Sequence, residues 1–289
     1  MNRFVCLMYH NVYREDQLGP GGPFATLGRS VRSYSVTTSQ FAEHIAAIGK
    51  GRWFDPDVLR KQIGRLNQRP KVLITFDDGW AGSIDEAGPI LGAAGARAIV
   101  FVTTSLIGHP LFASELMLRE LPTSVFEIGA HTATHPFLAE CTTEQIQREL
   151  QDSKSELEDI LGRPVETMSV PNGSLDERVL RIAADCGYSF VFTSETVVND
   201  AADNHGVLGR MAVRSTTRTE TIQRWCDGEI QGAGLTRKAL QLSRQVLGPD
   251  RYRQLRSWLL GEKREDNDMA DLIAAHRQQP RELLASMEA

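Results

Sequence analysis

Short apolar runs alternate with longer amphipathic segments along most of this chain. The runs are rich in β-branched and aromatic residues, and most are apolar throughout instead of alternating with polar positions. This composition is typical of strands in a parallel sheet that is covered on both faces. The runs comprise residues 5–10, 71–76, 98–103, 126–131, 166–171, 189–194 and 211–215.

Four segments between the runs have the hydrophobic spacing of helices that pack on a sheet. In the clearest one, Thr143 is the expected N-terminal cap and Gly162 the expected end. Residues 11–36 and 103–125 carry neither pattern and are expected to be irregular excursions. About seven strands with intervening helices predict an α/β fold, either a barrel or a doubly wound sheet. The four helical segments comprise residues 37–49, 84–95, 142–162 and 174–187.

The pattern changes after residue 228. Strand-like runs end there, and residues 235–261 and 269–287 predict helices separated by a charged break. We therefore predict a barrel domain over residues 1–228 and a basic helical extension over residues 229–289.

The first part of this extension is strongly basic. Residues 237–256 hold six basic residues and one acidic residue, with leucines along an apolar side. Two interpretations stay open. The segment is either a helical cap on the barrel with a solvated basic face, or it contacts an anionic membrane surface or a synthase through residues 235–260.

The composition is that of a soluble globular protein. The 289 residues carry a net charge of −5, with 41% hydrophobic and 24% charged residues. This excludes a collagen or a fully disordered chain and argues against broad nucleic-acid binding. The sequence has no apolar run long enough for a membrane span and no signal-peptide pattern at its start. The expected location is the cytoplasm, peripheral to the inner membrane if the basic segment binds there.

The four cysteines argue for free thiols. They are far apart and form no CxxC pair, which argues against zinc knuckles and against a disulfide framework.

The strongest chemical signal is the sequence TFDDG at residues 75–79, at the end of a predicted strand. Adjacent carboxylates repel one another unless a cation is near. A metal held by one Asp relieves that repulsion and leaves the other as a base. Gly79 permits the turn that keeps Asp77 and Asp78 in the cleft. A plain turn with two solvated acids is the alternative on these residues alone.

The second signal is HTATH at residues 131–135, again directly after a strand. The HxxxH spacing can place two imidazoles on one metal. Because Pro136 disfavours a helical conformation at His135, we predict a strand-to-loop turn for the pair. One Asp and two His with open positions suit a catalytic Zn²⁺, or Fe, Co or Ni, which polarises a carbonyl and activates water.

Two further strand ends carry candidate catalytic groups. In residues 169–173, Pro171 and Gly173 fix a tight turn, and the Asn172 backbone N–H is a candidate oxyanion donor. A simple strand-to-helix turn has the same pattern. His10 ends the first run and is a candidate acid for a leaving amine, with a structural histidine as the alternative. In an α/β barrel these strand ends meet at one face.

With these motifs in view, the chain resembles the polysaccharide deacetylase family, carbohydrate esterase family 4 with the NodB homology domain. It is most similar to the subgroup of exopolysaccharide-biosynthesis deacetylases. The resemblance runs from about Met8 to about Val213 and includes LMYHNV, VLITFDDGW, EIGAHTATH and the closing RMAV. It implies a distorted (β/α) barrel and metal-dependent removal of acetyl groups, usually from N-acetylglucosamine polymers.

The resemblance also implies a role for each matching residue, with Zn²⁺ as the expected metal and Co²⁺ or Ni²⁺ as alternatives. His10 matches a histidine that lies near the site in the subgroup. The other roles are base for Asp77, metal ligand for Asp78, His131 and His135, and oxyanion donor for the Asn172 amide.

Four departures from the family pattern bear on the acid catalyst and the substrate. Many members have an Arg two residues before the motif proline, where this chain has Ser169. A late Leu-x-His, the usual source of the acid histidine, is missing, as is a clear Asp-Trp motif. Asn172 supplies no aromatic ring for a sugar. Pro171 and Trp80 are the candidate substrate-binding residues, with a core position as the alternative for Trp80.

The function predicted from these residues is deacetylation of an N-acetylated glycan or its precursor in exopolysaccharide or cell-envelope metabolism. A second interpretation keeps the metal and changes the bond to an ester or a cyclic amide. A third is a non-catalytic glycan-assembly component that recruits synthases through residues 235–287.

Overall fold

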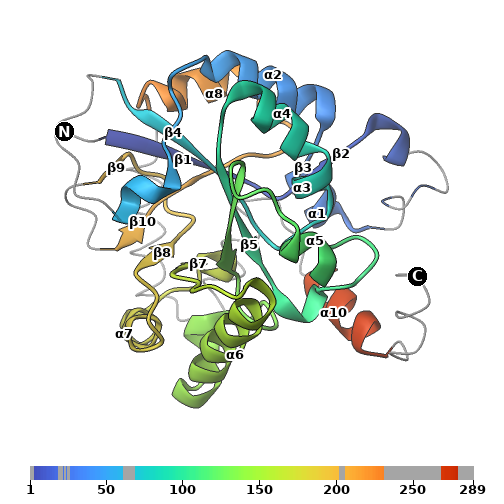
Figure 1. The fold of residues 1–289 in the computed structure, drawn as a ribbon, viewed down its shortest axis with the longest axis vertical. Helices are drawn as coiled ribbons and strands as arrows, with labels where there is room; N and C mark the ends of the chain where they lie inside the picture. Colours follow the sequence, from blue (N-terminus) through green and yellow to red (C-terminus); the bar gives the residue numbers. More distant parts are fainter. Residues whose placement is uncertain are drawn as a thin grey trace, which may run out of the picture.

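A nearly closed barrel of mostly parallel strands forms the centre of the molecule (Figure 1). The computed structural model describes residues 3–18, 22, 24, 27–60, 69–201, 206–230 and 268–278. Its main sheet has the strand order β10-β8-β7-β6-β5-β4-β1-β11, and β9 pairs antiparallel with β1. The end strands β10 and β11 are separated in the chain only by Gly209 and Arg210, so the sheet curls back on itself. The predicted α/β barrel is confirmed.

Each predicted run overlaps one strand of this sheet. Lys71–Phe76 matches its prediction end to end, whereas β9 and β10 were not predicted because two residues are too short to show a pattern. The strands are β1 (Arg3–Tyr9), β4 (Lys71–Phe76), β5 (Ala98–Val102), β6 (Phe126–Ala130), β7 (Thr167–Ser169), β8 (Phe190–Phe192), β9 (Asn199–Asp200), β10 (Val207–Leu208) and β11 (Met211–Ala212).

The two stretches expected to be irregular contain short elements, which corrects that prediction. Within residues 11–36, β2 (Asn11–Tyr13) and β3 (Ser35–Thr37) form a small parallel sheet of their own. Elements of three to six residues are too short for a hydrophobic period to show in the sequence. The others in these stretches are η1 (Glu15–Leu18), α1 (Arg29–Tyr34), η3 (Thr104–Leu106) and α5 (Glu115–Arg119).

Helices cover the outside of the barrel, with α2, α4 and α8 on one side and α6 and α7 on another (Figure 1). Thr142, not the predicted Thr143, caps α6, because its hydroxyl accepts from the Gln145 N–H in a capping box. The segment predicted at 84–95 is divided into two short helices. The helices are α2 (Thr38–Ile48), α3 (Gly82–Asp85), α4 (Ala87–Ala94), α6 (Thr143–Leu161), α7 (Glu177–Asp185), α8 (Thr219–Cys226) and α10 (Asp268–Gln278), with 3-10 turns η2 (Pro56–Arg60), η4 (Leu138–Glu140) and η5 (Pro171–Gly173).

The structure describes only part of the C-terminal segment for which helices are predicted. The basic segment at residues 235–260 lies outside the described residues, and α10 falls within the helix predicted at 269–287 apart from its first residue. The domain boundary at residue 228 stays a prediction. Among the described residues, no helix is both long and apolar enough to cross a bilayer. All four cysteines are free thiols, as predicted.

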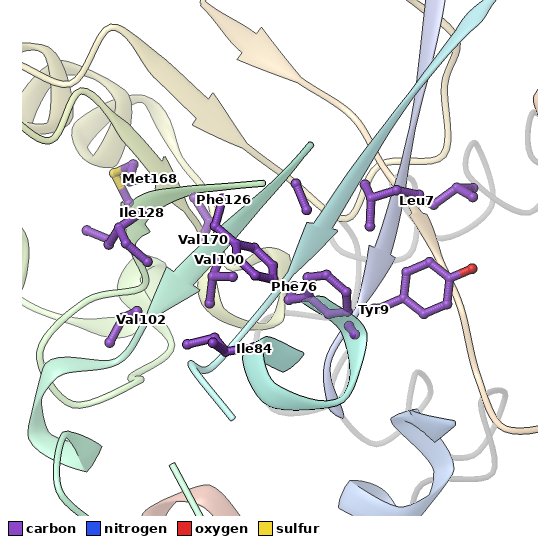
Figure 2. Close-up of a cluster of buried hydrophobic side chains, with 14 of the residues drawn as sticks. Leu7, Tyr9, Phe76, Ile84, Val100, Val102, Phe126, Ile128, Met168 and Val170 are labelled. Carbon is purple, nitrogen blue, oxygen red and sulfur yellow. The ribbon is translucent and has the colours of Figure 1, made fainter. Parts of the chain in front are cut away.

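The strands are buried on both faces and supply two cores. Along β4, Val72, Ile74 and Phe76 face the helices, and Figure 2 shows Phe76 in that outer cluster. The alternate residue Leu73 belongs to a separate inner cluster that also holds Phe101 and Phe192. This period of two explains why the runs are apolar throughout.

Candidate active site

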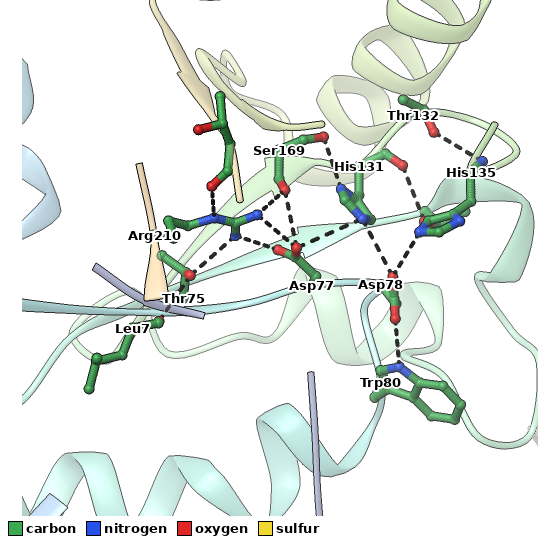
Figure 3. A network of polar contacts seen from close by, with 12 residues as sticks. Leu7, Thr75, Asp77, Asp78, Trp80, His131, Thr132, His135, Ser169 and Arg210 are labelled. Carbon is green, nitrogen blue, oxygen red and sulfur yellow. Dashed lines mark hydrogen bonds and ion pairs between the residues drawn. The ribbon is translucent and has the colours of Figure 1, made fainter. Parts of the chain in front are cut away.

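The predicted chemical groups meet at the carboxyl ends of the strands (Figure 3). Asp77 and Asp78 directly follow β4, His131 follows β6, and Ser169 is the last residue of β7. Because β4, β5, β6 and β7 are neighbouring parallel strands, their ends lie at one edge of the sheet.

Asp78, His131 and His135 form a candidate metal site. The Oδ1 atom of Asp78 lies 3.5 Å from Nε2 of His131 and 3.4 Å from Nε2 of His135. The three ligand atoms all lie within 4.8 Å of one another. Oδ1 of Asp78 is buried and has no hydrogen-bond partner, which is costly for a carboxylate oxygen unless a cation lies against it. These residues therefore fit a divalent metal, and the loop position predicted for the two histidines is confirmed.

Neighbouring groups fix the orientation of two of these ligands. Nδ1 of His131 donates to the Ser169 carbonyl oxygen at 2.9 Å, so the lone pair of this imidazole is on Nε2, which faces Asp78. The Trp80 indole N–H donates to Oδ2 of Asp78 at 3.1 Å, which turns Oδ1 toward the histidines. Nε2 of His131 and Oδ1 of Asp78 are thus turned toward one another.

Unusual backbone conformations gather at this site. Among the described residues, the non-glycine residues with positive φ are Asp78, Thr132, His135 and Asn172, at φ between 55° and 73°. Each such residue costs on the order of 1–3 kcal/mol, so the surrounding contacts must hold it. Gly79 also has a positive φ, and a side chain there would meet Val102, as the predicted tight turn requires.

Hydrogen bonds hold the loop that carries the two histidines. The Thr132 hydroxyl accepts from the His135 backbone N–H at 3.0 Å. Glu149, on α6, accepts from the Thr134 backbone N–H at 2.8 Å with one carboxylate oxygen and from the Thr134 hydroxyl at 2.5 Å with the other. This clamp lies between the two ligands in the chain and restrains the loop around them.

Asp77 is engaged by an arginine that the sequence analysis missed. Nη1 of Arg210 lies 2.6 Å from Oδ1 of Asp77, and Nη2 lies 2.8 Å from Oδ2. The Ser169 hydroxyl accepts from Nη2 at 2.6 Å and donates to Asp77 at 3.2 Å. The guanidinium packs over the rings of Phe101 and Phe192. Arg210 is fully buried, and a charge so placed is tolerated because it is paired.

The charges of the site keep both carboxyl groups ionised. Burial by itself raises the pKa of Asp77, but the charge of Arg210 outweighs it and holds that pKa below its ordinary value. Burial likewise opposes ionisation of Asp78, and the surrounding imidazoles hold its pKa well below the ordinary value. Burial lowers the pKa of His131 to about 4, so this imidazole is neutral at pH 7, as a metal ligand must be.

The comparisons with known proteins agree with this geometry. The family model for polysaccharide deacetylase matches residues 65–191, which include both carboxylates and both histidines. The middle of the chain is thus similar to the polysaccharide deacetylase family.

The relatives of this chain show how far the likeness extends. YxkH of Bacillus subtilis, a polysaccharide deacetylase by name, is 33% identical over 124 residues, 43% of this chain and 44% of that protein. The poly-β-1,6-N-acetyl-D-glucosamine N-deacetylase of Staphylococcus aureus is 23% identical over 242 residues, 78% of this chain and 83% of that protein. The chain spans less than half the length of the first curated relatives that it matches.

A solved structure supports the fold. The Streptococcus pyogenes deacetylase PplD in complex with acetate matches with a TM-score of 0.66 and 22% identity, covering 79% of this chain and 99% of that one. At this identity the likeness establishes the shared barrel.

Ser169 and Arg210 both contact Asp77. Ser169 carries no charge. Arg210, which lies just after β10, supplies the guanidinium that pairs with Asp77. In the sequence, Arg210 stands at the start of the closing RMAV, and neither period nor spacing links it to Asp77.

The remaining predicted residues have mixed outcomes. Trp80 is 1% exposed and its ring packs on Phe112, so it has no free face for a sugar, which corrects the substrate-stacking prediction. His10 follows β1, and its Nδ1 is buried without a hydrogen-bond partner. Burial lowers the pKa of His10, which disfavours the protonated form that an acid catalyst needs. Its acid role stays a prediction.

The turn after β7 has the geometry that was expected for it. Pro171 is buried, and Asn172 is exposed with φ of 55°. The oxyanion role of the Asn172 amide and the substrate contact of Pro171 stay predictions.

Proposed function

We propose that this protein is a metal-dependent N-deacetylase that acts on a polymer of N-acetylglucosamine. The observation that carries the proposal is the pairing, within one buried site, of a three-ligand metal set with an ionised carboxylate. Oδ2 of Asp77 lies 3.9 Å from Nε2 of the ligand His131, so base and metal site are adjacent. The match of residues 65–191 to the polysaccharide deacetylase family supports the reaction class.

Each residue of the site has a defined task in this proposal. Asp78, His131 and His135 hold the metal, which, when bound, polarises the acetyl carbonyl and makes water acidic. Asp77 accepts the proton from the water that attacks the carbonyl carbon. Arg210 keeps Asp77 ionised and fixes its orientation. The amide C–N bond breaks, acetate leaves, and the sugar amine takes up a proton.

The finer assignments are part of the same proposal. Zn²⁺ is the proposed metal because its usual ligands include imidazole and carboxylate. The proposed substrate is a glycan, or a glycan precursor, of bacterial exopolysaccharide or the cell envelope. Relatives named for chitin deacetylation and for poly-β-1,6-N-acetyl-D-glucosamine deacetylation support an N-acetylglucosamine polymer as the substrate class.

The test is acetate release from N-acetylglucosamine oligomers. The protein is first stripped of metal and then assayed before and after addition of Zn²⁺, with oligomers of both β-1,4 and β-1,6 linkage. Acetate that is released only after the metal is added supports the proposal. Tight zinc binding without acetate from any oligomer contradicts it, and release from O-acetyl esters in that protein would place it with the esterases.

A further inference from the structure

The C-terminal helix α10, red in Figure 1, is docked beside segments that hold the candidate metal site. Its residue Ile273 is 5% exposed and belongs to a hydrophobic cluster with Trp80, Leu106 and Phe112. Nε2 of His276 lies 3.3 Å from the Ile107 carbonyl oxygen. A helix that lies far along the chain from the metal ligands therefore packs against their supports.

The first link runs from α10 to Asp78 through Trp80. The Trp80 ring packs against Phe112, with ring centroids 4.1 Å apart, in the cluster that Ile273 joins. The backbone of the same segment is tied to residues 79–81, because Ala81 N–H donates to Leu111 and Ala113 N–H donates to Gly79. The indole N–H of this fixed ring then orients the Asp78 carboxylate, as Figure 3 shows.

The second link runs from α10 to the two histidines through η3. Leu106 lies in the Ile273 cluster, and the Ile107 carbonyl meets His276. The same short segment holds the histidine loop. Its hydrogen bonds to the loop are Thr104 N–H to Thr132 O at 3.3 Å, Ser105 N–H to Ala133 O at 3.0 Å, Ser105 Oγ to Ala133 O at 2.6 Å, and Thr103 Oγ to His131 O at 3.2 Å.

We propose that α10 is a positioning element of the metal site and that Ile273 is its main anchor. With α10 docked, the Trp80 ring and residues 104–107 are held from behind, so Asp78 and the histidine loop are set for the metal before it binds. Because ligands that are already in place lose little conformational entropy when the metal binds, their affinity for the metal is higher. The metal site then depends on a helix beyond the barrel domain predicted at residues 1–228. The inference rests on the metal site of the proposed function.

The test compares two neighbouring residues of α10 in the full-length protein. Ile273→Asp places a charge in the cluster, whereas Ala274→Asp places the same charge at an exposed position of the same helix. We expect Ile273→Asp to weaken Zn²⁺ binding about tenfold to a hundredfold, as measured by titration calorimetry, the range seen when groups that orient ligands are lost. Ala274→Asp is expected to bind Zn²⁺ like the parent.

Hydrogen exchange of the metal-free proteins gives a second, independent readout. We expect the amides of residues 104–107 and 132–135 to exchange faster in Ile273→Asp, while those of α6 and α7 keep the parent rates. Ile273→Leu, which keeps the apolar volume, is expected to keep the zinc affinity and the amide protection of the parent. Unchanged affinity and unchanged exchange in a folded Ile273→Asp protein would overturn the inference.

A replacement variant keeps the test decisive if the first variant does not fold. If Ile273→Asp unfolds the barrel, Ile273→Ala is measured in its place and is judged by the same two readouts. Neither readout depends on turnover. A parent that binds zinc and releases no acetate contradicts the proposed function, while the comparison of Ile273 with Ala274 still decides the role of α10.

Discussion

Arg210 places both terminal nitrogens of its guanidinium on the two carboxylate oxygens of Asp77, at 2.6 and 2.8 Å. Arg210 is followed directly by β11, Asp77 follows β4, and 133 residues separate them in the chain. The pair is buried, so each charge depends on the other. The bidentate geometry also fixes the plane of the carboxylate, which matters for a group that must accept a proton from one direction.

Two substitutions of Arg210 are expected to show its two effects, one on the stability of the fold and one on turnover. Arg210→Met leaves Asp77 buried and unpaired, so we expect a loss of about 3–5 kcal/mol in the free energy of unfolding, measured with urea. Arg210→Lys keeps the charge but cannot make two parallel contacts, and we expect kcat to fall about tenfold to a hundredfold in a folded protein.

The control for this prediction is Arg181→Lys, at an exposed position of α7. It should keep the parent kcat and stability. A parent-like kcat in Arg210→Lys would show that the orientation of Asp77 does not limit the reaction.

Substitutions of Asp77 and His131 are expected to distinguish loss of proton transfer from loss of metal binding. Asp77→Asn removes the base and leaves all three ligands, so we expect bound zinc to remain while turnover falls about 10²- to 10⁴-fold. His131→Ala removes a ligand, and we expect metal and activity to be lost together. Metal content by elemental analysis and acetate release in the same preparations check both. Zinc loss in Asp77→Asn to the level of His131→Ala would place Asp77 among the ligands.

Much of this site could be predicted from the sequence because its residues are local in the chain. Asp77 and Asp78 are adjacent, His131 and His135 are four apart, and each pair follows a recognisable strand. Residues that act across the barrel carry no such pattern. Arg210 lies in a stretch whose strands are two residues long, so neither period nor spacing linked it to Asp77.

Trp80 shows a second limit of sequence patterns. A tryptophan beside a catalytic motif fits a sugar platform and a core residue equally well. What decides between them is Phe112, Leu106 and Ile273, which come from distant segments and bury the ring. Ile273 reaches this cluster from a helix for which the sequence predicted no docking position.

Glu149 is expected to tune metal affinity without touching the metal. Its carboxylate holds both the N–H and the hydroxyl of Thr134, between the two histidine ligands. Glu149→Ala removes both acceptors, and we expect zinc affinity to fall about tenfold to a hundredfold. Glu149→Gln keeps one carbonyl acceptor and should lie between the two. The matched control is Glu156→Gln, at an exposed position of the same helix, and equal losses in both Gln variants would contradict the clamp.

His109 is expected to make the protein less stable in acid. Its Nδ1 accepts from the Leu111 N–H at 3.2 Å, and its ring lies 5.3 Å from that of His276. Burial, and then the neighbouring His276, lower the pKa of His109 from its ordinary 6.5 to about 4. Between these values the unfolded chain binds a proton that the folded protein does not, so stability is lost as the pH falls from 6.5 toward 4.

The variant His109→Asn isolates this contribution. Its side-chain oxygen can still accept from the N–H two residues on, whereas it takes up no proton. We expect the unfolding free energy of the parent to fall more steeply than that of the variant between pH 6.5 and 4, and the two curves to run parallel above pH 7. Other buried histidines are common to both proteins and cancel in the difference. Parallel curves through the whole range would show that burial does not hold His109 neutral in the folded protein.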